Sequence, residues 1–185
     1  MRVASAARRT MLGAMAAVAA AGWIGGAGAQ NRAFSFAYDQ PNTTAYGIAA
    51  NIFDAKLKEL SGGTMSINQF PGAQLGQEPQ MLQKMRAGDI DFVITSTANA
   101  STLAPQAGVF SLHFIFRDQN HLAKSLADPA ISAAFRDMVK DSVQGAQVIG
   151  LLTMGMRNMY SKKEIKNLAD VKGQKVRVQA TKTED

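Results

Sequence analysis

Two arginines near the C-terminal end are the residues best suited to bind an anion. Arg157 and Arg177 lie twenty residues apart, and the second falls within the run K-V-R-V at 175–178. Alternation in this run predicts a short strand with Val176 and Val178 on one face and Arg177 on the other, beside Gln179. A guanidinium is always charged and fits a carboxylate through two parallel hydrogen bonds. Two arginines on solvated strand edges would give the same pattern, so the spacing alone leaves both interpretations open.

The sequence contains little that favours enzymatic chemistry. It has no cysteine, no G-x-S-x-G nucleophile motif and no glycine-rich phosphate loop. His113 and His121 are isolated, so we expect structural or surface histidines rather than general bases. A metal site formed by clustered His, Asp or Cys residues is not indicated.

Three methionines provide one alternative function. Met154, Met156 and Met159 place thioethers close together in the sequence, and soft sulfur ligands suit Cu(I). Methionine is also a common flexible filler of cores and pockets. An exported copper-binding protein is therefore the alternative to an anion-binding one.

Residues 1–29 have the pattern of an export signal. Arg2, Arg8 and Arg9 precede a weakly apolar stretch at 11–24, and the small residues of 27–29 precede Gln30. The stretch is short for a membrane span, which needs about 20 well-apolar residues. We expect cleavage near Ala29 and a periplasmic product. The arginine pair resembles a twin-arginine signal, and general secretory export remains open.

Removing the signal changes the charge balance. The net charge of +6 includes three arginines and no acidic residue before Gln30, which leaves 17 basic and 14 acidic residues and a net charge of +3. Aromatic residues make up 7% of the chain and are not interleaved with basic ones. Nucleic-acid binding is therefore not expected.

Strand and helix patterns alternate from Phe34 onward. Strands are predicted at 34–38, 64–70 and 90–95, with an amphipathic helix from Tyr46 to Leu60 and a second helix opened by Glu78-Pro79 and closed by Gly88. This order predicts an α/β fold with parallel strands. Further along, the patterns indicate a strand-like run, two helices and another strand, at 109–116, 120–127, 131–143 and 147–152.

In open α/β sheets, ligands bind beyond the carboxyl ends of the strands. The loops at that edge are predicted at 39–43, 71–77 and 96–101. Helices that begin there present free N–H groups and the positive end of the helix dipole, which suit an anion.

Two sequence blocks resemble the substrate-binding proteins of tripartite ATP-independent periplasmic (TRAP) transporters, of the DctP-like family. These are F-P-G-A-Q-L-G at 70–76 and D-V-K-G-Q-K-V-R-V at 170–178, within a resemblance that runs from about Phe34 to Val178. His113 departs from the family, which usually has proline there. The resemblance implies a two-lobed periplasmic-binding-protein fold, with a first lobe at 30–153 and the beginning of a second at 154–185. By this comparison the chain is C-terminally truncated, and we expect it to bind more weakly than a two-lobed chain.

The resemblance also implies a function and a set of site residues. Arg177 would form a bidentate pair with the carboxylate of an organic acid, and Arg157 would add a second cationic donor. Asp39, Glu78 and Ser96 would contact the rest of the solute, although each is also a plausible cap or turn residue. Such a protein has no cofactor and catalyses nothing, because it captures a solute and delivers it to membrane permease subunits. Dicarboxylates, hydroxy or keto monocarboxylates and sulfonates all remain candidate solutes.

Overall fold

The computed structural model describes residues 31–143 and 145–179. The chain divides into a unit of residues 1–32 and a unit of residues 33–185, and the fold below belongs to the second. The predicted export signal and the segment after Gln179 lie outside the described residues. Within the described ranges, no helix is both long enough and apolar enough to cross a bilayer.

A three-stranded sheet forms the first part of the fold, in the order β2-β1-β3. β1 spans Arg32–Ala37, β2 spans Met65–Phe70 and β3 spans Phe92–Val93. β1 and β3 are parallel, with Phe36 opposite Phe92. The three predicted strands are confirmed, but β3 is shorter than the predicted 90–95. The residues that flank it bond to side chains, since Asp91 N donates to Ser35 Oγ and Ser96 N donates to Glu78 Oε2.

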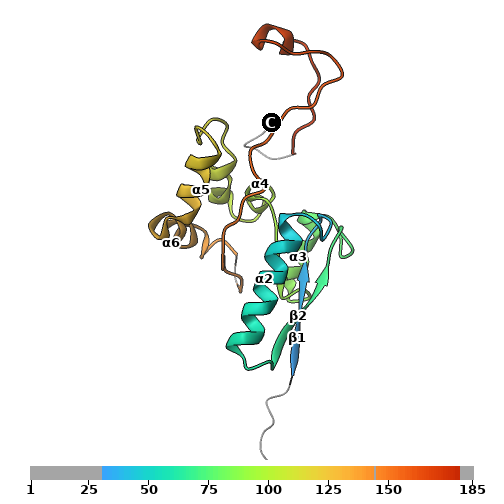
Figure 1. Cartoon of the computed structure of the whole chain (residues 1–185), viewed down its shortest axis with the longest axis vertical. Coiled ribbons are helices and arrows are strands. Elements are labelled where there is room, and N and C mark those ends of the chain that lie inside the picture. The colour runs from blue at the N-terminus through green and yellow to red at the C-terminus, as the bar shows by residue number, and fades with distance from the viewer. Residues whose placement is uncertain (1–30, 144, 180–185) are drawn as a thin grey trace, which may run out of the picture. The chain divides into compact units, whose positions relative to one another are not determined.

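Two helices, α2 (Ala45–Leu60) and α3 (Glu78–Ala87), cover this sheet. Phe36 of β1 belongs to a buried cluster with Tyr46 and Ala50 of α2, whereas Ala37 packs with Met81 of α3. Successive residues of a strand point to opposite faces, so the two helices lie on opposite sides of the sheet. Figure 1 shows α2 alongside β1 and β2. Both predicted helices are confirmed, and α3 ends at a left-handed Gly88 with φ of 88°, as expected of a C-cap glycine.

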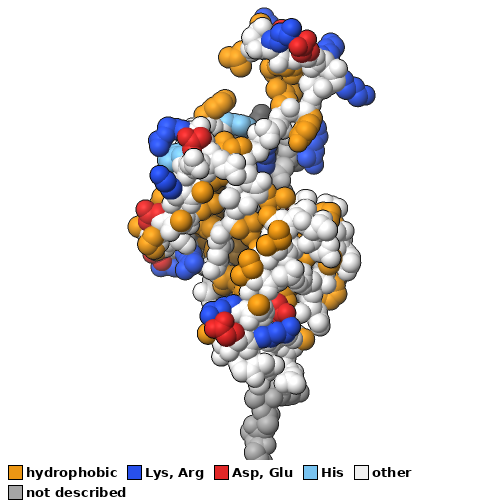
Figure 2. All heavy atoms as spheres, viewed as in Figure 1, with side chains coloured by type: hydrophobic (Ala, Val, Ile, Leu, Met, Phe, Trp, Pro, Cys, Tyr) orange, Lys and Arg blue, Asp and Glu red, His pale blue; other side chains and the backbone are white. Residues whose placement is uncertain are grey.

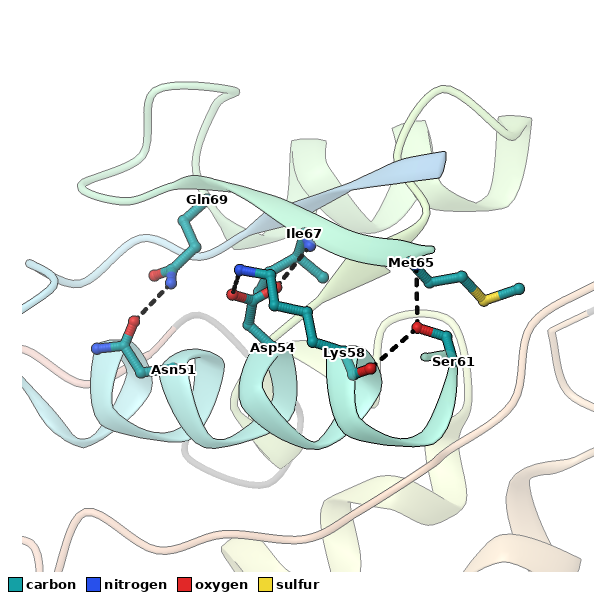
Figure 3. Close-up of polar contacts among 7 residues, drawn as sticks. All are labelled: Asn51, Asp54, Lys58, Ser61, Met65, Ile67 and Gln69. Atoms are coloured by element: carbon teal, nitrogen blue, oxygen red, sulfur yellow. Dashed lines mark hydrogen bonds and ion pairs between the residues drawn. The ribbon is translucent and has the colours of Figure 1, made fainter. Parts of the chain in front are cut away.

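Side chains of α2 protect the edge strand β2. Asp54 accepts a hydrogen bond from Ile67 N at 2.9 Å and pairs with Lys58 Nζ at 2.6 Å. Ser61 Oγ accepts from Met65 N at 3.0 Å, so two alternate N–H groups of β2 are satisfied by helix side chains (Figure 3). Unpaired edge groups invite pairing with other chains, and these contacts block that route.

The rest of the core is mainly helical. It contains α4 (Thr97–Ala100), the 3₁₀ helix η1 (Pro105–Ser111), α5 (Gln119–Ala127) and α6 (Pro129–Val139). Phe135 and Val139 of α6 are buried against Ala104 and Ala107, with Phe110 packed on Phe135 at a ring separation of 5.0 Å. The helices predicted at 120–127 and 131–143 are confirmed, the second ending four residues early.

Three predicted strand-like segments are not strands. The run at 109–116 falls on the end of η1 and the turns after it, because its apolar side chains, such as Phe110, pack against α6 rather than a sheet. The segments 147–152 and 175–178 are irregular, since no described segment pairs with them. Val176 and Val178 are consequently 50% and 37% exposed. Between these segments lies the 3₁₀ helix η2 (Leu168–Val171), which is capped by Asn167.

Candidate functional site

Glu78 is the one charged residue that is buried within the described ranges, with 4% of its surface exposed. It is the first residue of α3, where the positive end of the helix dipole favours a carboxylate. Four donors converge on its Oε2 atom: Thr95 Oγ1 at 3.0 Å, Ser96 N at 2.9 Å, Ser96 Oγ at 2.8 Å and Asn99 Nδ2 at 2.6 Å. A carboxylate oxygen suits such a site because it only accepts hydrogen bonds. These bonds join the start of α3 to the segment after β3.

Ser96 connects this cluster to the start of α4. It is the N-cap of α4, where its Oγ accepts a hydrogen bond from Asn99 N at 3.2 Å. The same oxygen accepts from Gln179 Nε2 at 3.2 Å, and its own hydrogen is donated to Glu78. The predicted site residue Ser96 therefore contacts both Glu78 and a residue from the far end of the described chain.

Asp39 adds a second carboxyl group beside Glu78. It follows β1 and Tyr38, and its Oδ1 accepts a hydrogen bond from Gln40 Nε2 at 3.2 Å. Burial raises the pKa of Asp39, and the neighbouring charge of Glu78 raises it further. Burial also raises the pKa of Tyr46, with smaller contributions from the charges of Glu78 and Asp39. Both shifts indicate that these groups are partly removed from water, with the charge of Glu78 as a further cause.

Arg157 supplies the cationic part of the site. Its Nη2 atom donates to Gln179 Oε1 at 3.1 Å, and the residue is exposed. Sequence reasoning placed Gln179 on the same strand face as Arg177 but gave it no role. Its contacts with Arg157 and Ser96 could not be found from the sequence, because they join residues 22 and 83 positions apart.

Most of these groups line one cavity of about 1190 Å³. The polar residues that line it include Asp39, Tyr46, Glu78, Ser96, Arg157 and Gln179. Four of the five predicted site residues therefore share one cavity. Arg177 does not line it, is exposed, and forms no hydrogen bond or ion pair with any described residue. Figure 2 shows acidic and basic side chains interspersed on the visible face rather than gathered in a single basic patch.

Neither histidine belongs to the polar cluster formed by Asp39, Glu78 and Ser96. His113 lines the same cavity in the turns after η1, beside Phe114, which is 99% exposed. His121 lies in the first turn of α5, where its Nδ1 accepts a hydrogen bond from Arg117 N at 3.3 Å. Met154, Met156 and Met159 are 53%, 44% and 50% exposed. Among the described residues no group of three or more His, Cys, Asp or Glu side chains is placed to hold a metal ion.

Comparison with known families identifies the scaffold. The family model for bacterial extracellular solute-binding proteins, family 7 (DctP), matches residues 36–184. The chain belongs to this family. As a DctP-family protein it is 29% identical over 146 residues to the C4-dicarboxylate-binding protein DctB of Bacillus subtilis. It is 30% identical over 145 residues to the 2,3-diketo-L-gulonate-binding periplasmic protein YiaO of Escherichia coli.

These alignments cover 78% and 77% of this DctP-family chain, but only 41% and 43% of the two relatives. The chain thus spans about two fifths of the length of the curated relatives it matches.

Solved structures confirm the fold. A TRAP periplasmic solute-binding protein from Pseudomonas putida F1, crystallised with D-glucuronate, has a TM-score of 0.75 and 27% identity. That match covers 81% of this chain and 49% of the other. A TRAP solute-binding protein from Sulfurospirillum deleyianum with bound succinate has a TM-score of 0.53 and 25% identity, over 60% and 36% of the two chains. The predicted α/β periplasmic-binding-protein fold and the resemblance to TRAP binding proteins are therefore correct. These relatives give no support to the copper alternative.

Proposed function

We propose that this DctP-family chain captures an organic acid through its carboxylate in the periplasm and delivers it to the membrane permease subunits of a TRAP transporter. The observation that carries the proposal is one cavity lined by the Arg157 guanidinium and by the polar cluster of Asp39, Glu78 and Ser96. A cation and a set of hydrogen-bonding groups facing one space match a small solute with an anionic end and a polar body.

In this proposal the protein binds and releases its solute without changing it. Arg157 and Arg177 hold the carboxylate, and Asp39, Glu78 and Ser96 contact the rest of the molecule. Residues 30–153 form the first lobe and residues 154–185 begin the second. The relatives that bind C4-dicarboxylate, 2,3-diketo-L-gulonate, D-glucuronate and succinate support an organic acid as the solute class.

A thermal-shift screen of the mature chain against organic acids tests this function. The panel contains succinate, D-glucuronate, D-erythronate, a keto acid and a sulfonate, with glucose as an uncharged control and Cu(I) as the metal control. A ligand at 100 times its dissociation constant stabilises the fold by about 2.7 kcal/mol. We expect at least one acid to raise the melting temperature, and Arg157→Ala to reduce the shift. A folded chain stabilised by no acid at millimolar concentration would overturn the proposal.

A further inference from the structure

We infer that Gln179 is a positioning residue of the binding site. It holds the Arg157 guanidinium in a fixed position relative to Ser96 and Glu78. This inference rests on the proposed function, since it names a further residue of the same site. Gln179 is half-buried, lines the cavity and contacts both Arg157 and Ser96. Its carboxamide accepts from Arg157 at one end and donates to Ser96 at the other.

The direction of each hydrogen bond fixes the orientation of this carboxamide. A guanidinium can only donate, so the atom that faces Arg157 must be the Gln179 oxygen. Ser96 donates its hydroxyl hydrogen to Glu78, so its oxygen is an acceptor for the Gln179 nitrogen. Glu78 only accepts while ionised, which completes a chain that runs from Gln179 through Ser96 to Glu78. Rotating the carboxamide by half a turn would place donor against donor at Arg157.

This arrangement gives Gln179 a role in restraining the Arg157 side chain. Arg157 lies in an irregular segment, where no regular element fixes its side chain. The bond to Gln179 uses one of the five N–H donors of the guanidinium. A long side chain that is restrained before the solute arrives loses less conformational entropy on binding. Gln179 therefore improves affinity through Arg157 without contacting the carboxylate itself.

Isothermal titration calorimetry of Gln179→Leu tests the inference, with the panel acid that stabilises the wild-type chain most as the probe. Leucine keeps the approximate volume but removes both hydrogen bonds. We expect affinity to fall about tenfold, the effect of losing one hydrogen bond to a charged group. Gln174→Leu is the matched control, because Gln174 is also a half-buried glutamine of this segment but donates to Asp170 O and does not line the cavity. That variant should bind like wild type.

A double-mutant cycle separates positioning from general stability. If Gln179 acts through Arg157, then Gln179→Leu should change affinity less than twofold in the Arg157→Ala background. Equal losses in both backgrounds, or binding by Gln179→Leu within twofold of wild type, would overturn the inference. A wild-type chain that binds no acid of the panel would instead overturn the proposed function.

If Gln179→Leu folds poorly, a measurement without ligand can still test whether Gln179 bridges Arg157 and Ser96. In the ligand-free protein, the side-chain amide resonance of Gln179 should shift in both Ser96→Ala and Arg157→Ala spectra, while that of Gln174 should not. A Gln179 resonance that is unchanged in both variants would contradict the bridge.

Discussion

Arg157 and Arg177 occupy different environments although they have the same chemistry. Arg157 lines the cavity and bonds Gln179, whereas Arg177 is exposed and outside the lining. Solute binding can still recruit Arg177, because an exposed guanidinium on an irregular segment can reorient at little cost. The bidentate role of Arg177 stays a prediction, and mutation of each arginine separates their contributions.

We predict that Arg177→Ala weakens binding of the organic acid by about 2–5 kcal/mol, roughly 30-fold to several thousand-fold, because truncation leaves a desolvated carboxylate unpaired. Arg177→Lys should also bind poorly, since an ammonium cannot reproduce the planar fork. Calorimetry with the best acid of the panel measures both. Affinity within threefold of wild type for Arg177→Ala, with a large loss for Arg157→Ala, would assign the carboxylate to Arg157 alone.

At the scale of elements, the Asp54 carboxylate is one of the groups that join α2 to β2. The hydrogen bond from Lys58 and then that from Ile67 N lower the pKa of Asp54 below its ordinary value of 3.8. A lowered folded-state pKa contributes stability that is present above the unfolded-state pKa and is lost as pH falls through the folded-state pKa. Asp54 should therefore stabilise the fold at neutral pH and lose this effect in acid.

We predict that Asp54→Ala lowers the free energy of unfolding by about 1 kcal/mol at pH 7, the usual net value of a hydrogen bond at a solvent-screened site. The difference from wild type should shrink as the pH falls below 3.8. Urea unfolding at several pH values measures it. Glu59→Ala is the control, because Glu59 forms only an exposed pair with Lys56 and should change stability by less than about 0.5 kcal/mol. Equal effects of the two variants would show that the edge contact is not stabilising.

The first turn of α2 lies against the loop that carries Asp39. A Cβ atom added at Gly47 would lie 1.9 Å from the carbonyl oxygen of Asn42, so the backbone itself would have to move. We predict that Gly47→Ala costs about 1–3 kcal/mol of stability, as overpacking does, and weakens acid binding by displacing this loop. Gly150→Ala is the control for stability, since nothing lies within 4 Å of its added Cβ. Thermal unfolding and calorimetry measure both effects, and a neutral Gly47→Ala would contradict the packing.

At the scale of the whole molecule, the sequence predicted those helices and strands that have a clear local periodicity of apolar residues. The helices α2 and α3 and the three strands carry clear apolar repeats and turn residues, and the structure confirms them. The irregular segments 147–152 and 175–178 were mispredicted because a strand requires a partner, which a local pattern cannot supply. Site prediction had the same limit. The loops predicted after β1 and β3 contain Asp39 and Ser96, so these two residues could be identified from the sequence. The hydrogen bond from Gln179 to Ser96 could not, because it joins residues that are far apart in the sequence.

The charge arrangement of the cavity leads to a prediction about the solute. Arg157 attracts a carboxylate, whereas Asp39 and Glu78 place negative charge and hydrogen-bond acceptors elsewhere in the same cavity. A second carboxylate near these groups would be repelled, while a hydroxyl group could donate to them. We therefore predict that the chain prefers a hydroxylated monocarboxylate such as D-glucuronate to the dicarboxylate succinate by about tenfold or more, equivalent to 1.4 kcal/mol.

Calorimetry with the two acids measures this preference, and Asp39→Asn tests its cause. Replacing the carboxylate by an amide removes one negative charge and adds a donor, so succinate should gain affinity relative to D-glucuronate. Asp89→Asn is the control, because Asp89 is exposed and does not line the cavity. Tighter binding of succinate than of D-glucuronate by the wild-type chain would show that the second carboxylate of the solute avoids the Asp39–Glu78 pair.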